Sequence, residues 1–160
     1  MTVIIDGTAG ITYPSGSGTQ AAQSKVLQVI SATYATETSY SSSTLTDSNL
    51  TASITPLFST SKILVLVSQN GLGKDSSNTY ERVGLVRGST FLVYALVQGG
   101  QTNSTAVNYG YSASLAYLDS PSTTSSVTYK TQIGSGANTG NVYAQLGSAT
   151  STLTLMEIAV

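Results

Sequence analysis

The stretch VNYGYSASLAY, residues 107–117, alternates apolar or aromatic side chains with small or polar ones. Because successive residues of a β-strand point to opposite faces of a sheet, this alternation predicts a strand with one face against a core. The core face is expected to carry Val107, Tyr109, Tyr111, Ala113, Leu115 and Tyr117, opposite Asn108, Gly110, Ser112 and Ser114. The pattern therefore predicts a half-buried strand.

A hairpin is predicted before this strand. The runs TYERVGLVRG (79–88) and TFLVYALVQGG (90–100) are rich in β-branched and aromatic residues, and Gly88 and Ser89 lie where they meet. A short connection of this kind suits two antiparallel strands joined by a tight turn. Gly99 and Gly100 are expected to end the second strand.

Two further strands are predicted from LTASITP and ILVLV. The first, residues 50–56, places Leu50, Ala52 and Ile54 on one face with Pro56, which limits the segment to a sheet edge or a strand end. The second, residues 63–67, is apolar on both faces and is expected at the centre of the core, followed by QNGLGKDSSN (69–78) as a loop. The remaining strands are expected at 25–34, 126–133, 141–147 and 151–159, with a loop at 134–140.

The composition agrees with an all-β fold. Serine and threonine fill 50 of the 160 positions and ten residues are tyrosine, whereas only 8% are charged, so strand formers outnumber helix formers. Hydrophobic residues make up 40% of the chain, which is enough to build a core. Apart from a short turn allowed at 19–29, no helix is expected. We predict an antiparallel β-sandwich of jelly-roll type over residues 25–160, with about eight or nine strands.

The first 24 residues differ from the rest of the chain. They combine a short apolar patch, VII at 3–5, with Gly, Ser and Pro14, and they show no sustained period. Such a segment is typical of an extended N-terminal arm outside the core. A frayed terminus without a function is the alternative.

Charge and missing residue types exclude several classes. With six Lys or Arg, seven Asp or Glu and a net charge of −1, the chain lacks the electrostatic field that would recruit nucleic acid or a membrane surface.

Few charged residues are available to protect the edges of the sheets, so we expect self-association, as a homotrimer. No membrane span or N-terminal signal peptide is predicted, because no apolar run is long enough and Met1 to Ile5 has no basic flank.

Enzymatic sites find little support. The chain has no Cys and no His, so catalytic triads with an imidazole base and ordinary zinc sites are excluded. Ser59 and Lys62 match S-x-x-K by spacing, but that motif should open a helix and Lys62 leads into ILVLV. Around Lys74, GLGKD lacks the first glycine and the Ser or Thr of a phosphate loop. No enzyme and no cofactor are therefore expected.

Carboxylates leave two minor alternatives open. Asp47 and Asn49 resemble the start of a calcium loop, but the Gly and Glu that such a loop needs are missing. A polysaccharide-cleaving site needs two carboxylates about 5–10 Å apart, for which Asp75, Glu81 and Asp119 are the candidates. The simpler expectation is that these three are solvated charges.

Several segments together resemble a known group of proteins. GITYPSGSGTQ, VLQV, LTASITP, SKILVLVS, GLVRGST, YLDSP, SVTYKTQ and STLTLMEIA, which extend over nearly the whole chain, are similar to small structural proteins of tailed bacteriophages, notably those of marine or cyanobacterial hosts. The resemblance implies a virion protein on the outer surface of the particle, made in the host cytoplasm. Related jelly-roll trimers serve as capsid decoration (cement) proteins, head fibres or tail fibres.

Two functions follow as expectations. In the first, a capsid decoration trimer binds the major capsid protein through the arm, with Val3, Ile4, Ile5, Ile11 and Tyr13 as anchoring residues. It is favoured because a tail fibre would need a longer shaft than this chain offers. In the second, the arm joins a tail protein and the loops at 69–79, 99–105 and 134–141 bind a host glycan, with tyrosines as stacking surfaces. Tyr109, Tyr111 and Tyr117 are expected in the core instead, and Tyr80, Tyr129 and Tyr143 are weaker candidates. A polysaccharide-cleaving spike ranks third.

Overall fold

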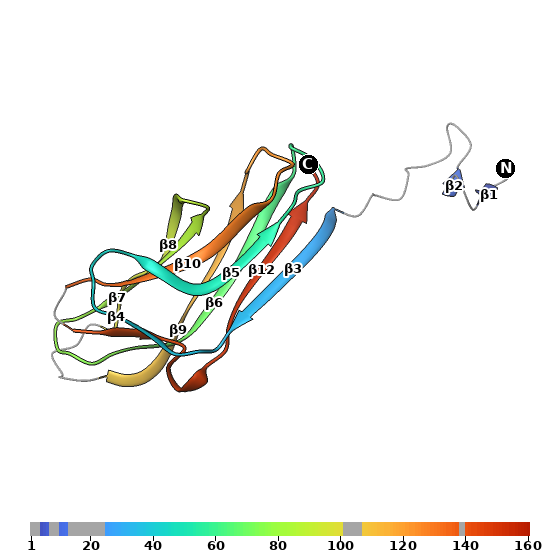
Figure 1. The fold of residues 1–160 in the computed structure, drawn as a ribbon. Coiled ribbons are helices and arrows are strands. Elements are labelled where there is room, and N and C mark those ends of the chain that lie inside the picture. The colour runs from blue at the N-terminus through green and yellow to red at the C-terminus, as the bar shows by residue number, and fades with distance from the viewer. Residues whose placement is uncertain (1–3, 7–9, 13–24, 101–106, 138–139) are drawn as a thin grey trace.

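The computed structural model describes residues 4–6, 10–12, 25–100, 107–137 and 140–160. Across this part of the chain the structure is all-β, with one 3-10 turn and no α-helix (Figure 1). The strands are β1 (Ile4–Asp6), β2 (Gly10–Thr12), β3 (Val26–Tyr34), β4 (Thr38–Tyr40), β5 (Thr46–Ile54), β6 (Lys62–Lys74), β7 (Glu81–Arg87), β8 (Thr90–Gly99), β9 (Val107–Asp119), β10 (Val127–Ser135), β11 (Val142–Ala144) and β12 (Ser151–Ile158), and the 3-10 turn η1 is Leu146–Ser148.

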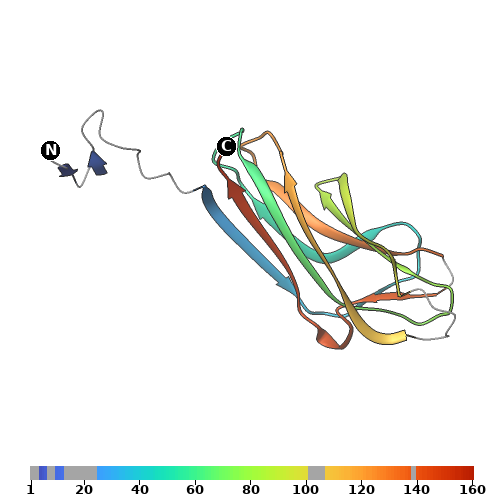
Figure 2. The same ribbon diagram turned by 180° about the vertical axis from the view of Figure 1, so that it is seen from behind.

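Two antiparallel sheets form the body of the protein. The four-stranded sheet has the order β5-β10-β7-β8, and the six-stranded sheet has the order β3-β12-β6-β11-β4 with β9 also paired to β6. Residues 63–68 of β6 pair with β12 and with β9, so these two strands flank β6. β11 pairs with the far end of β6 at Gly73 and Lys74. The six-stranded sheet is thus built around β6, which runs the length of the sandwich (Figure 2).

The sheets enclose an apolar core because their inward faces follow the two-residue period of the strands. Leu50, Ala52 and Ile54 of β5 face Ile63 and Val65 of β6 across the sandwich and share one core cluster. A second cluster lies nearer the far end of β6. Its buried members are Leu72, Val83, Ala113, Ile133, Val142 and Ala144.

Hydrogen-bonded polar side chains lie buried in the same interior. The Thr131 hydroxyl donates to Gln69 Oε1 at 2.8 Å, and Gln69 Nε2 donates to Ser151 Oγ at 3.1 Å. Gln145 Nε2 donates to the same hydroxyl at 3.0 Å, and Ser48 bonds to Thr131. We call these five residues the polar layer. Because β10 belongs to one sheet and β6 and β12 to the other, the layer fixes the two sheets relative to each other.

Most expected strands are confirmed. The strand at 25–34, the hairpin with its turn at Gly88 and Ser89, and the strand at 107–117 are all present. β5 is an edge strand, as Pro56 required. Gly88 has φ 57°, a left-handed conformation that glycine adopts at little cost.

Three expectations were wrong in part. Residues 69–74, expected in a loop, continue β6 through Lys74. The expected strand at 141–147 is limited to β11, because Gln145 and Gly147 adopt left-handed conformations and the chain turns through η1. In β6, Leu64 and Leu66 are half-buried, so only one face of this strand lies fully in the core.

The N-terminal segment contains a short antiparallel pair. β1 and β2 form a two-stranded sheet of their own, with Ile4 opposite Thr12 and Ile5 opposite Ile11. Val3 and Tyr13, the other two expected anchoring residues, lie outside the described residues. The boundary between the arm at 1–24 and the domain at 25–160 stays a prediction.

Candidate functional site

The outer face of the six-stranded sheet carries a row of apolar side chains. Val29, Met156, Leu64 and Leu118 stand directly opposite one another across β3, β12, β6 and β9. Val29 is 53% exposed and Leu118 is 51% exposed, and the two central residues are half-buried. We call these four residues the apolar row. Four aligned apolar side chains on an outer sheet face are a candidate contact surface, since single exposed ones need no explanation but clusters do.

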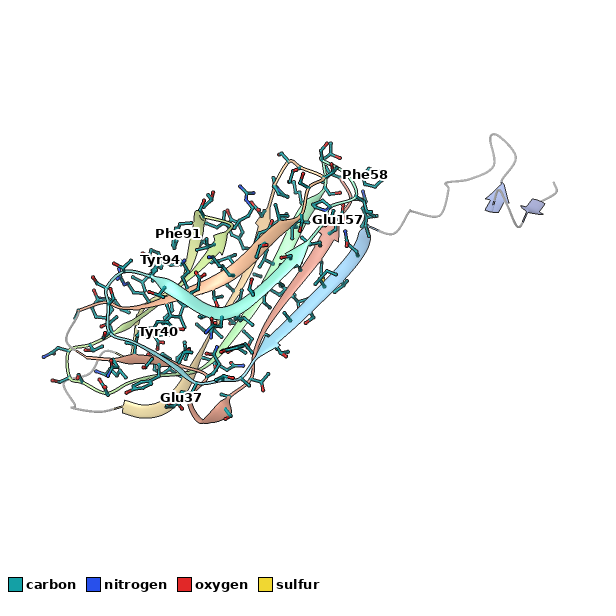
Figure 3. The ribbon with its side chains drawn as sticks, in the orientation of Figure 1. Glu37, Tyr40, Phe58, Phe91, Tyr94 and Glu157 are labelled. Carbon is teal, nitrogen blue, oxygen red and sulfur yellow. The ribbon has the colours of Figure 1, made fainter. Side chains whose placement is uncertain are left out.

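One end of the sandwich is also apolar. Val26, Leu57, Phe58 and Val160 are all exposed there, and we call them the apolar end. The Glu157 carboxylate holds the turn between β5 and β6 in place, because Oε1 accepts hydrogen bonds from the Leu57 and Phe58 amides at 2.8 and 3.4 Å. In Figure 3, Phe58 and Glu157 lie at the end of the sandwich where β3 begins.

Loops gather at the other end of β6. The Asp75 carboxylate accepts hydrogen bonds from the Asn141 amide at 2.8 Å, from Asn141 Nδ2 at 2.6 Å and from the Tyr143 hydroxyl at 3.1 Å. Although burial opposes the change, these bonds lower the pKa of Asp75. The Gly136 amide donates to the Tyr80 carbonyl at 2.7 Å. Residues 75–80, 136–137 and 140–141, which we call the loop end, therefore meet at this end of β6.

The loop prediction was only partly right in its bounds. Residues 69–74 belong to β6 and residues 134–135 belong to β10. Of the expected loop at 99–105, Gly99 ends β8, and residues 101–105 lie outside the part of the chain that the structure describes. Residues 138–139 also lie outside it.

The tyrosines divide between core and surface. Tyr111 and Tyr117 pack against the two core clusters, as expected. The side chain of Tyr109 lies outside the described residues. Tyr129 is fully buried and belongs to the first cluster, which removes it as a sugar-binding candidate. Tyr143 stays at the loop end through its bond to Asp75.

The expectation that Glu81 and Asp119 are solvated was wrong. Glu81 is fully buried, and burial raises its pKa to about 9 in spite of the hydrogen bond that the Tyr111 hydroxyl donates at 2.8 Å. Asp119 is 7% exposed, and its Oδ2 accepts bonds from Arg87 Nη1 at 2.7 Å and from the Tyr129 hydroxyl at 2.6 Å. Both carboxyl groups are thus buried and hydrogen-bonded to neighbouring side chains.

The S-x-x-K match, the phosphate-loop match and the calcium candidate lack the surroundings that their chemistry needs. Lys62 begins β6, so Ser59 and Lys62 do not open a helix as S-x-x-K requires. Lys74 is buried at the end of the same strand. Among the residues whose positions are described, no three or more His, Cys, Asp or Glu side chains form a group that could hold a metal ion. Asp47, the calcium candidate, is instead paired with Lys130 at 2.6 Å.

An aromatic pair on the four-stranded sheet was not predicted from the sequence. Phe91 and Tyr94 of β8 are 42% and 39% exposed, and their ring centroids are 4.7 Å apart with the planes tilted by 56° (Figure 3). Their signal in the sequence, two aromatic residues three positions apart in a run of apolar residues, is the same as that of ordinary strand packing.

Comparisons with known proteins do not point to a function, so a proposal has to start from the surfaces described in this section. No protein-family model matches the chain, and no curated protein matches it either. Within the described segments, none of the helical structure is long and apolar enough to cross a membrane.

Proposed function

We propose that this protein is a structural protein of a bacteriophage particle, a capsid decoration protein that binds the assembled shell as a homotrimer. The observation that carries the proposal is the apolar row, because a half-exposed line of apolar side chains across four strands is stabilised when another copy covers it. The resemblance of the sequence to small phage structural proteins supplies the setting. The partners are then two further copies and the major capsid protein, on the outer surface of the virion.

We also infer that the two sheets form a jelly roll. Support comes from the nested pairing of strands: β3 pairs with β12, β4 with β11, β5 with β10, β6 with β9, and β7 with β8. The first strand of the domain thus pairs with the last, the next with the next to last, and so on inward to the single hairpin. Such nesting is what results when a long antiparallel hairpin is rolled up into two sheets.

The arm and the apolar end are assigned to the shell contact. β3 starts at the apolar end, where Leu57 and Phe58 are more than half exposed, so both surfaces can face the particle together. The residues proposed to contact the shell from the arm are Val3, Ile4, Ile5, Ile11 and Tyr13. Because the protein would bind only the assembled shell, it stabilises the shell by mass action, and three linked arms raise the strength of attachment.

A pull-down tests this function. The full chain is incubated with emptied phage heads and, separately, with host cells or their surface polysaccharide. We expect binding to heads, and a version lacking residues 1–24 should keep its fold and lose that binding. Binding to cells alone would defeat the decoration role, and normal coating of heads by the truncated chain would remove the arm as the anchor.

The alternative is the receptor-binding tip of a tail fibre. The observation that favours it is the loop end, where Asp75, Asn141 and Tyr143 are joined by hydrogen bonds at the opposite end of β6 from the apolar end. In this arrangement the arm joins a tail protein and the loop end points toward a host glycan. The same pull-down separates the two functions, because a fibre tip binds cells and leaves heads bare.

A further inference from the structure

The aromatic pair has an unusual setting on the outer face of the four-stranded sheet. Gly84 of β7 lies opposite Tyr94, and a Cβ added at Gly84 would come within 2.6 Å of Phe91 Cε2 and 3.2 Å of Leu45 Cδ1. The missing side chain at this position is therefore what allows the Phe91 ring to lie over the sheet. The Phe91 ring thus packs on the Gly84 backbone, while Phe91 and Tyr94 keep 42% and 39% of their surface exposed.

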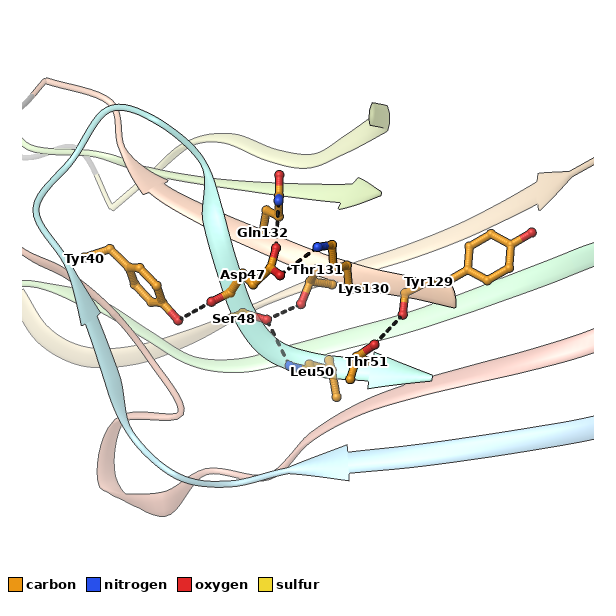
Figure 4. A network of polar contacts seen from close by, with 9 residues as sticks. All are labelled: Tyr40, Asp47, Ser48, Leu50, Thr51, Tyr129, Lys130, Thr131 and Gln132. Atoms are coloured by element: carbon orange, nitrogen blue, oxygen red, sulfur yellow. Dashed lines mark hydrogen bonds and ion pairs between the residues drawn. The ribbon is translucent and has the colours of Figure 1, made fainter. Parts of the chain in front are cut away.

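Polar side chains border this surface on the next strands. On β10, Lys130 lies opposite Val86 and Gln132 lies opposite Gly84, and on β5 Asp47 lies opposite Gln132. The Asp47 carboxylate is bound by Lys130 Nζ at 2.6 Å and by Gln132 Nε2 at 2.7 Å (Figure 4). Although burial opposes it, these two bonds lower the pKa of Asp47, so its carboxylate stays charged at neutral pH.

The bordering cluster presents donors and acceptors with balanced charge. Lys130 and Asp47 neutralise each other as an ion pair, and their side chains are 25% and 47% exposed. The Gln132 amide carries both an acceptor oxygen and N–H donors. A polyanion would gain little from such a cluster, whereas a neutral molecule with several hydroxyl groups can both donate to it and accept from it.

Away from β8 and the bordering cluster, this sheet face carries exposed polar side chains. Beyond the cluster, Ser53 and Thr128 bond to each other at 2.7 Å, and both are exposed. Among the described residues, the exposed large apolar side chains of the four-stranded sheet all belong to β8: Phe91, Tyr94 and Val97. An aromatic surface of one or two rings beside hydroxyl-binding groups matches a sugar ring, which has an apolar C–H face and a polar edge.

We propose that the aromatic pair and the Asp47–Lys130–Gln132 cluster form a binding site for a neutral saccharide, with one pyranose ring stacked on Phe91 and Tyr94 and its hydroxyls bonded to Gln132 and Asp47. The site lies on the sheet opposite the apolar row, so it stays open when that row is covered by another copy. It is distinct from the loop end, and it does not depend on whether the protein belongs to the head or the tail.

Saturation-transfer NMR tests the site on the full chain. The probes are methyl glycosides of glucose, galactose, mannose and N-acetylglucosamine at about 10 mM, because one stacked ring supports only weak binding. At least one probe should receive saturation, and it should shift the amide signals of Gly84 and Tyr94. We expect Tyr94→Ala and Gln132→Ala each to weaken that binding, the former by about tenfold.

Phe58→Ala is the matched control, because Phe58 is an exposed aromatic residue at the apolar end, away from the site. It should bind the saccharide as the unchanged chain does. The inference is overturned if no probe receives saturation, if Tyr94→Ala binds as well as the unchanged chain, or if dextran sulfate competes better than neutral dextran. None of these results bears on head binding, so the proposed function fails or stands separately.

Discussion

Shortening Leu118 to alanine should weaken the proposed trimer without unfolding the domain. Leu118 is at the β9 edge of the apolar row, where it lies opposite Leu64 and is 51% exposed. Burying a whole leucine side chain is worth about 2 kcal/mol, so covering the exposed half contributes about 1 kcal/mol in each copy. Three copies together lose about 3 kcal/mol, which lowers the association constant of the trimer roughly a hundredfold.

Sedimentation equilibrium over a range of protein concentrations measures this change. Leu57→Ala is the control, because Leu57 is 59% exposed but lies in the turn between β5 and β6, outside the apolar row. Circular dichroism should show the same strand content in both variants and in the unchanged chain. If Leu118→Ala and Leu57→Ala associate equally well, the apolar row is not the surface that joins the copies.

Three further changes test the interior. The raised pKa of Glu81, about 9 against an ordinary 4.5, means that the folded protein retains a proton that the unfolded chain releases, so the contribution of Glu81 to stability is fully present below about pH 4.5 and is lost as the pH rises toward 9. In urea titrations, Glu81→Gln should flatten the fall in stability over this pH range, and an equal slope in both proteins would refute the assignment. Asp119→Ala should cost about 3 kcal/mol of unfolding free energy because Arg87 and Tyr129 lose their buried partner, and a loss below 1 kcal/mol, on the order of a surface change, would contradict it. Gln69→Ala should cost about 2 kcal/mol by the same measurement, since the buried hydroxyls of Thr131 and Ser151 each lose one hydrogen bond while keeping their bonds to Ser48 and Gln145, and a neutral effect would mean that the polar layer adapts.

The strands could be predicted where one face is apolar and the other polar. In residues 111–117 the alternation of small polar and large apolar residues matches the burial of the strand, and in β5 Leu50, Ala52 and Ile54 do the same. These patterns are local, so they can be recognised without knowing what packs against them.

The end of β6 could not be predicted in this way. Gln69 and Asn70 are polar and Gly71 follows them, which is a typical loop pattern. The strand continues because the Gln69 amide is satisfied by Thr131 and Ser151, two residues far away in the chain. Long-range partners also explain why Glu81 and Asp119 are buried although carboxylates are usually exposed.

The candidate surfaces depend on register, which the sequence alone does not supply. Val29, Leu64, Leu118 and Met156 belong to four separate strands, and they form a row only because the pairing places them opposite one another. One sign was present in the sequence, since the run at 63–67 is apolar on both faces, and Leu64 belongs to its outer face. The aromatic pair likewise becomes a surface only because Gly84 lies under the Phe91 ring.

The mass of the full chain in solution, measured by native mass spectrometry at micromolar concentration, tests the self-association at the centre of this account. We predict a species of three copies of the 16.4 kDa chain, with a larger share of single chains at the same concentration when Leu118 is shortened. A single copy at every concentration would contradict the account, since the apolar row would then face only water.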